Sequence, residues 1–312
     1  MQLNRGAPPP QIGLNTGIAA RELVANEREG ATGTPGVPSA RSDVRRGRWR
    51  QSLRRPRCGT MSGMSPSDVV LITGGGSGIG AGLAGALHAR GSQVIVAGHG
   101  RERVEAVAAR HPGMQAEVVD VADPEQVAAL AERVGQRWPQ LTTVISNAGI
   151  QHLVDFAGPG PLDIAELGRE VDVNHKGVIY VANAFLPLLK AQPRARLVNV
   201  GSGLGYVPLA AAPIYSSTKA AVHSFTIALR LQLKNSTVQV VELIPPVVVT
   251  DLHRHLDRIQ PRAMELDDFV DAAMVGLDAG REEIVVGLAK ALRIFSRAAP
   301  SLGLKVVNQK AN

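Results

Sequence analysis

The sequence contains a single cysteine and no long apolar run. Cys58 is the only cysteine among 312 residues, so no intrachain disulfide can form and the fold suits a reducing compartment. No apolar stretch approaches the roughly 18 to 20 residues that span a bilayer. The N-terminal region also lacks the apolar segment of a secretory signal. These absences predict a cytoplasmic protein without a transmembrane segment.

The eight histidines do not form the pattern of a metal site. Only His253 and His255 stand at ligand spacing, and no cysteine supports them. Both fall in residues 251–262, which we interpret as a lid, and a solvated lid surface accounts for them. The sequence therefore predicts no bound metal.

The basic residues are unevenly distributed. Residues 1–60 hold eleven arginines, no lysine and four acidic residues, a net charge of +7. Residues 61–312 hold 23 basic and 23 acidic residues, a net charge of zero. The folded part therefore has no electrostatic support for a nucleic-acid surface, and no nucleic-acid partner is expected.

Residues 1–64 are predicted to be a disordered basic leader. They are rich in Pro, Gly, Arg and Ser, and they lack the apolar period that would offset the entropy of ordering. Three interpretations compete: a non-native extension from an upstream start codon, an Arg-rich targeting segment, and a weak polyanion-binding tail. Met61 and Met64 lie just before the first strand and favour the extension.

From Val69 onward, short apolar runs alternate with amphipathic stretches, which is typical of parallel strands joined by crossover helices. The predicted strands are Val69–Thr73, Gln93–Ala97, Ala116–Val119, Thr142–Ser146, Ala195–Gly201, Val238–Ile244 and Glu283–Val286. The predicted helices are Ile79–Ala89, Arg101–Arg110, Pro124–Arg137, Glu166–Lys190, Pro213–Lys234 and Leu266–Ala279. Seven strands fit one doubly wound parallel α/β sheet of the Rossmann-like type. We therefore expect residues 65–312 to form a single domain, ending in a tail, residues 288–307. Its alternating basic and apolar residues could touch a membrane surface, but packing on the subunit or on a partner subunit is favoured.

The first predicted strand ends in the glycine run of residues 73–80. Right-handed crossovers place the carboxyl end of every parallel strand at one edge of the sheet, where ligands of open α/β folds bind. A glycine-rich turn lets the backbone approach a pyrophosphate, and the N-terminus of the following helix favours negative charge. Alone, this spacing also fits an ordinary tight turn.

Tyr215 and Lys219 are one helical turn apart. A phenol with a pKa of about 10 acts as an acid or base near neutrality only if its pKa is lowered, and a neighbouring ammonium would lower it. Together with the glycine run, this pair predicts a nicotinamide-dependent oxidoreductase.

Four motifs, in this order, resemble those of the single-domain short-chain dehydrogenases/reductases. Residues 73–80 match the family's T-G-x-x-x-G-x-G, residues 146–149 its N-N-A-G, and residues 215–219 its Y-x-x-x-K. Asn174 matches the family's helix asparagine, and Ser202 lies thirteen residues before Tyr215, as in the family. The resemblance covers about residues 68–290.

A closer resemblance is to the DltE-like subgroup, and it rests on Pro245-Pro246 and on the segments Glu283–Gly287 and Ala289-Lys290. Pro246 stands where most family members have glycine. Because proline fixes φ and removes an N–H, the local backbone path is expected to differ there.

The family resemblance implies a role for each member of the tetrad. Tyr215 would exchange a proton with the substrate oxygen while a hydride passes between the nicotinamide and the carbonyl carbon. Lys219 would lower the phenol pKa and hold the nicotinamide ribose. Ser202 would donate a hydrogen bond to the substrate oxygen, and Asn174 would fix a water that links Lys219 to solvent. A homodimer or homotetramer is also implied, formed through the helix of Tyr215 and the helix before it.

The resemblance also implies the cofactor contacts, from the glycine run to the segment over the nicotinamide. They are Gly74, Ser77, Gly78, Ile79, Gly80, His99, Asp120, Val121, Asn147, Ala148, Gly149, Tyr215, Lys219, Pro245, Val248 and Thr250.

The end of the second strand bears on the choice of cofactor. A carboxylate there would bind the adenosine 2′-hydroxyl of NAD, and Gly98 supplies none. His99 and Arg101 offer positive charge to a 2′-phosphate. The sequence therefore favours NADP(H), with NAD(H) as the alternative.

The predicted function is reversible hydride transfer between a nicotinamide cofactor and a small-molecule carbonyl compound or secondary alcohol. One alternative is a catalytically silent protein that senses the nucleotide through the same fold, and another is an epimerase or dehydratase that retains its cofactor. The intact tetrad speaks against the first and the compact C-terminal part against the second. The loops 151–161, 204–213 and 251–262 should shape the substrate pocket, and their apolar content indicates a hydrophobic carbonyl compound.

Overall fold

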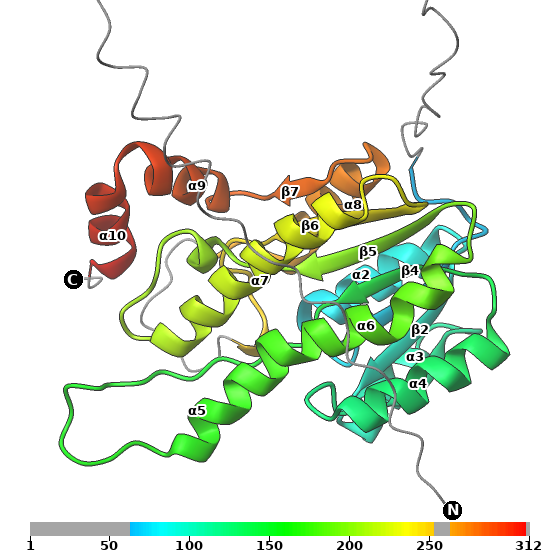
Figure 1. The fold of residues 1–312 in the computed structure, drawn as a ribbon, viewed down its shortest axis with the longest axis horizontal. Helices are drawn as coiled ribbons and strands as arrows, with labels where there is room; N and C mark the ends of the chain where they lie inside the picture. Colours follow the sequence, from blue (N-terminus) through cyan, green and yellow to red (C-terminus); the bar gives the residue numbers. More distant parts are fainter. Residues whose placement is uncertain (1–62, 253–262, 310–312) are drawn as a thin grey trace, which may run out of the picture. The chain divides into compact units, whose positions relative to one another are not determined.

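The computed structural model describes residues 63–252 and 263–309. Its described residues contain a seven-stranded sheet in the order β3-β2-β1-β4-β5-β6-β7, and every neighbouring pair is parallel. Helices lie on both faces of this sheet (Figure 1). The strand order reverses beside β1, which creates the crevice in which doubly wound folds bind ligands. The predicted Rossmann-like α/β fold is thus confirmed.

The strands are short and lie close to their predicted positions. They are β1 (Val69–Thr73), β2 (Gln93–Gly98), β3 (Gln115–Val118), β4 (Leu141–Ser146), β5 (Ala195–Val200), β6 (Val238–Ile244) and β7 (Glu283–Val285). The α-helices are α2 (Gly78–Ala89), α3 (Arg101–Ala109), α4 (Pro124–Arg137), α5 (Ile164–Val171), α6 (Gly177–Lys190), α7 (Pro213–Gln232), α8 (Leu266–Asp278), α9 (Ala289–Ala298) and α10 (Pro300–Asn308). Two short helical segments complete the order: η1 (Asp172–Lys176), a π-helix, and η2 (Gly203–Gly205), a 3₁₀-helix.

The sheet has an apolar core on each face because successive strand side chains point to opposite sides. In β1, Val69 and Leu71 join the core that α4, α6 and α7 cover, whereas Val70 and Ile72 join the core of α2, α3 and α8. Strands buried on both faces read as continuous apolar runs, which is why the sequence predicts them well. The sheet is therefore a rigid base for the loops at its carboxyl edge.

Two regions differ from the predicted elements. The predicted helix Glu166–Lys190 consists of α5, the π-helix η1 and α6, and it begins at Ile164. The tail forms the two short helices α9 and α10, which follow β7 (Figure 1). The hydrogen bonds of a π-helix span five residues instead of the four of an α-helix, so η1 changes the directions in which the side chains before and after it point.

Two predicted segments lie largely outside the described residues. Of the leader predicted at residues 1–64, residues 1–62 lie outside the described ranges, as do residues 253–262 of the predicted lid, which include His253 and His255. Within the ranges that the structure covers, no helix combines the length and apolar character needed to cross a membrane.

Candidate active site

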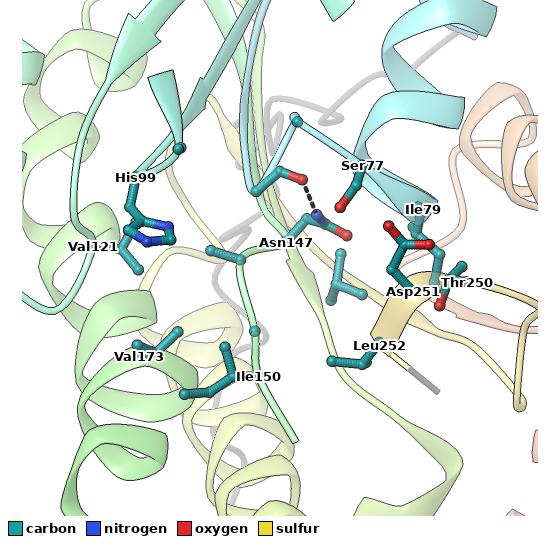
Figure 2. Close-up of a pocket in the computed structure, with 18 of the residues that line it drawn as sticks. Ser77, Ile79, His99, Val121, Asn147, Ile150, Val173, Thr250, Asp251 and Leu252 are labelled. Atoms are coloured by element: carbon teal, nitrogen blue, oxygen red, sulfur yellow. Dashed lines mark hydrogen bonds between the residues drawn. The ribbon is translucent and has the colours of Figure 1, made fainter. Parts of the chain in front are cut away.

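A cavity of about 420 Å³ lies at the carboxyl edge of the sheet. It is formed largely by residues at or after the ends of β1, β2, β3, β4, β5 and β6, and by helix α7, which carries Tyr215 and Lys219. It is lined by every predicted cofactor residue except Gly80 and Val248. Figure 2 shows the side chains of His99 and Val121 on one side of the cavity, and Ser77, Thr250 and Asp251 on the other. The structure thus brings together residues that are far apart in the sequence.

The glycine run forms a turn that leaves no room for side chains. Gly74 has a φ of +66°, and a Cβ on it would lie 2.7 Å from the Ala148 Cα. A Cβ on Gly80 would lie 2.6 Å from the Asn147 Nδ2, inside the contact distance of real side chains. Helix α2 begins at Gly78, and the first backbone N–H groups of a helix have no acceptor within that helix. This turn therefore has the shape and the donors that a phosphate requires.

Asn147 holds this turn in place. Its Nδ2 donates to the carbonyl oxygens of Thr73 and Gly74, both at 3.1 Å, and its backbone N donates to the Thr73 Oγ1 at 3.1 Å. The dashed line in Figure 2 marks an interaction of this amide. Asn147 thus links the ends of β1 and β4 at the floor of the cavity.

Helix α7 carries Tyr215 and Lys219 to the cavity wall. Both side chains are almost completely buried, with 6% and 4% of their surface exposed. The Lys219 Nζ donates to the Val200 carbonyl oxygen at 2.9 Å and lies 5.5 Å from the centroid of the Tyr215 ring. The one-turn spacing therefore places the two groups side by side at the end of β5.

Burial controls the ionisation of both groups. It raises the pKa of the Tyr215 phenol to about 12, the Glu170 charge adds to this, and a hydrogen bond with Ser202 opposes it. Burial also lowers the pKa of the Lys219 amine to about 8, although Glu242 and Glu170 act to raise it. Burial thus acts on the phenol pKa in the direction opposite to the lowering predicted from Lys219, and that role of Lys219 stays a prediction.

The other two members of the tetrad lie behind the cavity surface. The Ser202 Oγ accepts a hydrogen bond from the Leu204 backbone N at 3.1 Å, and Ser202 acts to lower the pKa of Tyr215. Asn174, fully buried in the π-helix, accepts from the Ile150 N at 2.8 Å through its Oδ1 and donates to the Ile150 O at 2.8 Å through its Nδ2. The same Nδ2 contacts the Thr218 Oγ1 at 3.2 Å. Asn174 therefore fixes the chain after β4 against α7, one residue from Lys219.

The basic residues beyond β2 are arranged differently from the prediction. Arg101 forms an ion pair with Glu105, with 3.2 Å between the Nη1 and the Oε1, and it does not line the cavity. Arg103, which the sequence did not suggest, lines the cavity together with His99. Successive positions near a helix start point about 100° apart, so residues 101 and 103 face nearly opposite directions. The positive charge predicted at this end of the cavity comes from Arg103.

Asp120 and Val248 were both predicted to contact the cofactor. Asp120 lines it and forms an ion pair with Arg169 at 2.7 Å, and Arg169 was not predicted. Val248 is fully buried, and the segment around it is tied to Met264 by the Val249 N and the Val247 O, both at 2.9 Å. The predicted contact of the Val248 backbone with the cofactor stays a prediction.

One group of potential metal ligands occurs in the described part of the chain. Ligand atoms of His223, Glu242 and Glu283 lie within 4.8 Å of one another. They are engaged by other groups: His223 Nδ1 contacts Glu242 at 2.7 Å, and Glu283 accepts from Tyr206 at 2.8 Å and from Arg293 at 2.5 Å. A cation would have to displace these proton donors, so we interpret the group as a hydrogen-bond network.

Comparison with known proteins agrees with these motifs. The family described as short chain dehydrogenase matches residues 68–260. DltE of Bacillus subtilis, named an uncharacterized oxidoreductase, is 37% identical over 235 residues, which are 74% of this chain and 93% of DltE. An uncharacterized oxidoreductase of Staphylococcus aureus is 32% identical over 214 residues, 67% of this chain and 90% of its own.

Solved structures give the same result. A short chain dehydrogenase of Burkholderia cenocepacia in complex with NADP has a TM-score of 0.68 and 26% identity, and the match covers 79% of this chain and all of that one. A short-chain dehydrogenase of Sphingobium yanoikuyae in complex with NADPH has a TM-score of 0.66 and 28% identity, over 78% of this chain and 98% of its own. The chain therefore belongs to the short-chain dehydrogenase/reductase family and is DltE-like.

Proposed function

We propose that the protein is an NAD(P)-dependent oxidoreductase that transfers a hydride between the cofactor and a carbonyl compound or secondary alcohol. One observation carries this proposal: Tyr215 and Lys219 line the same cavity as the glycine turn. A proton donor and a phosphate-binding turn in one cavity are what nicotinamide chemistry requires. The similarity to named oxidoreductases and to structures holding NADP or NADPH supports it.

The residues of the cavity fit a nicotinamide dinucleotide. The glycine turn and the N-terminus of α2 would hold the pyrophosphate, Asp120 and Val121 the adenine end, and Asn147, Ala148 and Gly149 the floor. When bound, the cofactor supplies the hydride acceptor or donor.

The protein's own groups would manage the proton. With pKa values of about 12 and about 8, Tyr215 is protonated and Lys219 mostly charged near neutrality. A protonated phenol can give its proton to the oxygen of a carbonyl substrate, as reduction requires. Ser202 can donate a hydrogen bond to the same oxygen, and the Lys219 charge stabilises the phenolate that remains.

We further propose a preference for NADP(H). Gly98 offers no carboxylate to the adenosine ribose, whereas His99 and Arg103 line the cavity beside it. Arg103 makes no ion pair with any described residue, so its guanidinium is available to a 2′-phosphate. NAD(H) is the alternative.

The substrate is proposed to be a hydrophobic carbonyl compound. Two of the loops predicted to shape its pocket are joined, because the Val154 N donates to the Ala211 O at 2.9 Å. Leu153 and Phe156 on the first loop are 45% and 64% exposed, so this loop presents large apolar side chains at the surface. They offer an apolar surface to a substrate that approaches Tyr215.

A homo-oligomer formed through α7 is the corresponding proposal for assembly. Ile227 and Leu231 are 40% and 66% exposed and stand one turn apart on this helix, as an apolar contact face requires. A location in the cytoplasm stays a prediction from the sequence.

The proposal is tested with a panel of aldehydes, ketones and secondary alcohols, followed by the absorbance of NADPH or NADH, with cofactor binding measured separately by fluorescence. Turnover of at least one carbonyl compound is expected. Tight cofactor binding without turnover of any member would favour the silent nucleotide-sensing protein. Conversion without net change in NADPH would favour the epimerase or dehydratase.

A further inference from the structure

A buried carboxylate lies behind the Tyr215–Lys219 pair. Glu170, in the last turn of α5, has no exposed surface, and α5 packs against α7. It does not line the cavity. A fully buried glutamate is rare and costs free energy unless its charge is used, so its position beside the catalytic pair requires an explanation.

The two oxygens of Glu170 have different surroundings. The Oε2 accepts a hydrogen bond from the His152 backbone N at 3.3 Å and lies 3.1 Å from the His152 Nδ1. The Oε1 is buried and has no hydrogen-bond partner among the described residues. The His152 side chain is 39% exposed, so it connects the buried carboxylate to solvent. Anchoring the loop after β4 would need only the bond to the His152 backbone.

The Glu170 charge acts on both Tyr215 and Lys219. It favours the ammonium form of Lys219 and disfavours the phenolate of Tyr215, so it raises the pKa of each. The titratable groups that interact with Glu170 are His152 from the loop after β4, and Tyr215 and Lys219 from α7. Lys219 faces one other buried carboxylate, Glu242 of β6, which has its own histidine partner, His223.

We propose that Glu170, held in its charged form by His152, is a positioning residue that sets the protonation of the Tyr215–Lys219 pair and thereby the pH range of the reaction. This inference rests on the proposed function for its consequence in catalysis. Its electrostatic part concerns only the protein's own residues.

The sign of each perturbation follows from the contacts. In Glu170→Gln the negative charge is lost, so the pKa values of Lys219 and Tyr215 both fall and the pH–rate profile moves toward acid. Burial raises the Glu170 pKa and the His152 contacts lower it. In His152→Ala, Glu170 therefore stays protonated to higher pH, and the profile moves in the same direction by a smaller amount.

The test is an NMR titration of the Lys219 side chain in the cofactor-free protein with isotope-labelled lysine, through the neutral and alkaline range. The chain has seven lysines, and the resonance that disappears in Lys219→Met identifies Lys219. A pKa near 8 is expected in the wild type. A fall of about half to one pH unit is expected in Glu170→Gln, as for the loss of one charge at medium range.

Controls separate this role from a structural one. Glu166→Gln removes an exposed carboxylate one turn earlier on the same helix and should leave the titration unchanged. Glu170→Asp keeps the charge and should restore most of the Lys219 pKa, even if the loop loosens. The double variant Glu170→Gln/His152→Ala should match Glu170→Gln alone, because His152 acts through Glu170.

The outcomes are distinct. If Glu170→Gln leaves the Lys219 titration unmoved in a folded protein, the inference is overturned, while hydride transfer by the wild type would stand. If the titration moves as expected but no carbonyl compound is turned over, the electrostatic coupling holds and the proposed function fails. A pH–rate profile of the wild type and the variants then shows whether the coupling sets the working pH.

Discussion

Replacing Lys219 by methionine should stabilise the protein while abolishing its activity. The folded-state pKa of Lys219 is about 8, against an ordinary value of 10.5. At about 1.36 kcal/mol per pKa unit, holding the charged amine in this site costs about 3 kcal/mol at neutral pH. Methionine has a similar shape and no charge, but it leaves the Val200 carbonyl without its donor, a loss of about 1 kcal/mol. The expected net gain in the free energy of unfolding is about 2 kcal/mol.

The gain should depend on pH in a defined way. Because the folded-state pKa lies below the unfolded-state pKa, the unfolded chain binds more protons between about pH 8 and pH 10.5, and wild-type stability rises through this window. The advantage of Lys219→Met is therefore full below pH 8 and fades toward pH 10.5. Thermal unfolding of the cofactor-free proteins measures it, with a rise in Tm of about 5 °C at neutral pH.

Lys234→Met is the matched control, because Lys234 is exposed near the end of the same helical region and its replacement should change Tm little. A lower Tm for Lys219→Met at neutral pH would contradict the reasoning. A difference in Tm that does not change between neutral and alkaline pH would contradict it as well.

Two further predictions concern the cofactor and the assembly. Arg103→Ala should raise the KM for NADPH by about tenfold and leave the KM for NADH nearly unchanged, because one charged hydrogen-bonding partner of the 2′-phosphate is lost. Arg101→Ala is the control. Equal effects on the KM of both cofactors would reject Arg103 as the 2′-phosphate partner. Leu231→Glu should lower the molar mass found by sedimentation, because it places a charge on the exposed apolar face of α7. Val275→Glu, equally exposed on α8, should leave the mass unchanged, and an unchanged mass for Leu231→Glu would place the contact elsewhere.

The sheet could be predicted from the sequence because its strands are buried on both faces. β1 and β6 are apolar almost throughout, and their ends match the predicted residues. The tail was not predicted as helices, because α9 and α10 are short and mostly exposed. Short helices depend on tertiary contacts that a local pattern does not contain.

The tetrad could be placed because its spacing follows the fold, but its electrostatics could not. The Tyr215–Lys219 spacing predicts that the two groups are neighbours. It does not reveal that burial raises the pKa of Tyr215 and lowers that of Lys219, since burial depends on everything packed around α7. The π-helix that carries Asn174 is also invisible to a pattern of ordinary helical period.

Contacts between distant segments were the hardest to predict. Glu170 and His152 are eighteen residues apart and meet only because α5 lies against the loop after β4. Arg103 rather than Arg101 lines the cavity although α3 begins at Arg101 as predicted, because positions 101 and 103 of the helix point in nearly opposite directions. These side-chain contacts depend on backbone geometry rather than on residue type.

The central claim is that Tyr215 is the proton donor in a nicotinamide-dependent reaction. The direct measurement is NADPH consumption with the best carbonyl substrate, compared between the wild type and Tyr215→Phe, with NADPH binding measured on both. The account predicts unchanged binding and a fall in turnover of about a hundredfold or more. Equal turnover by the two proteins would contradict it.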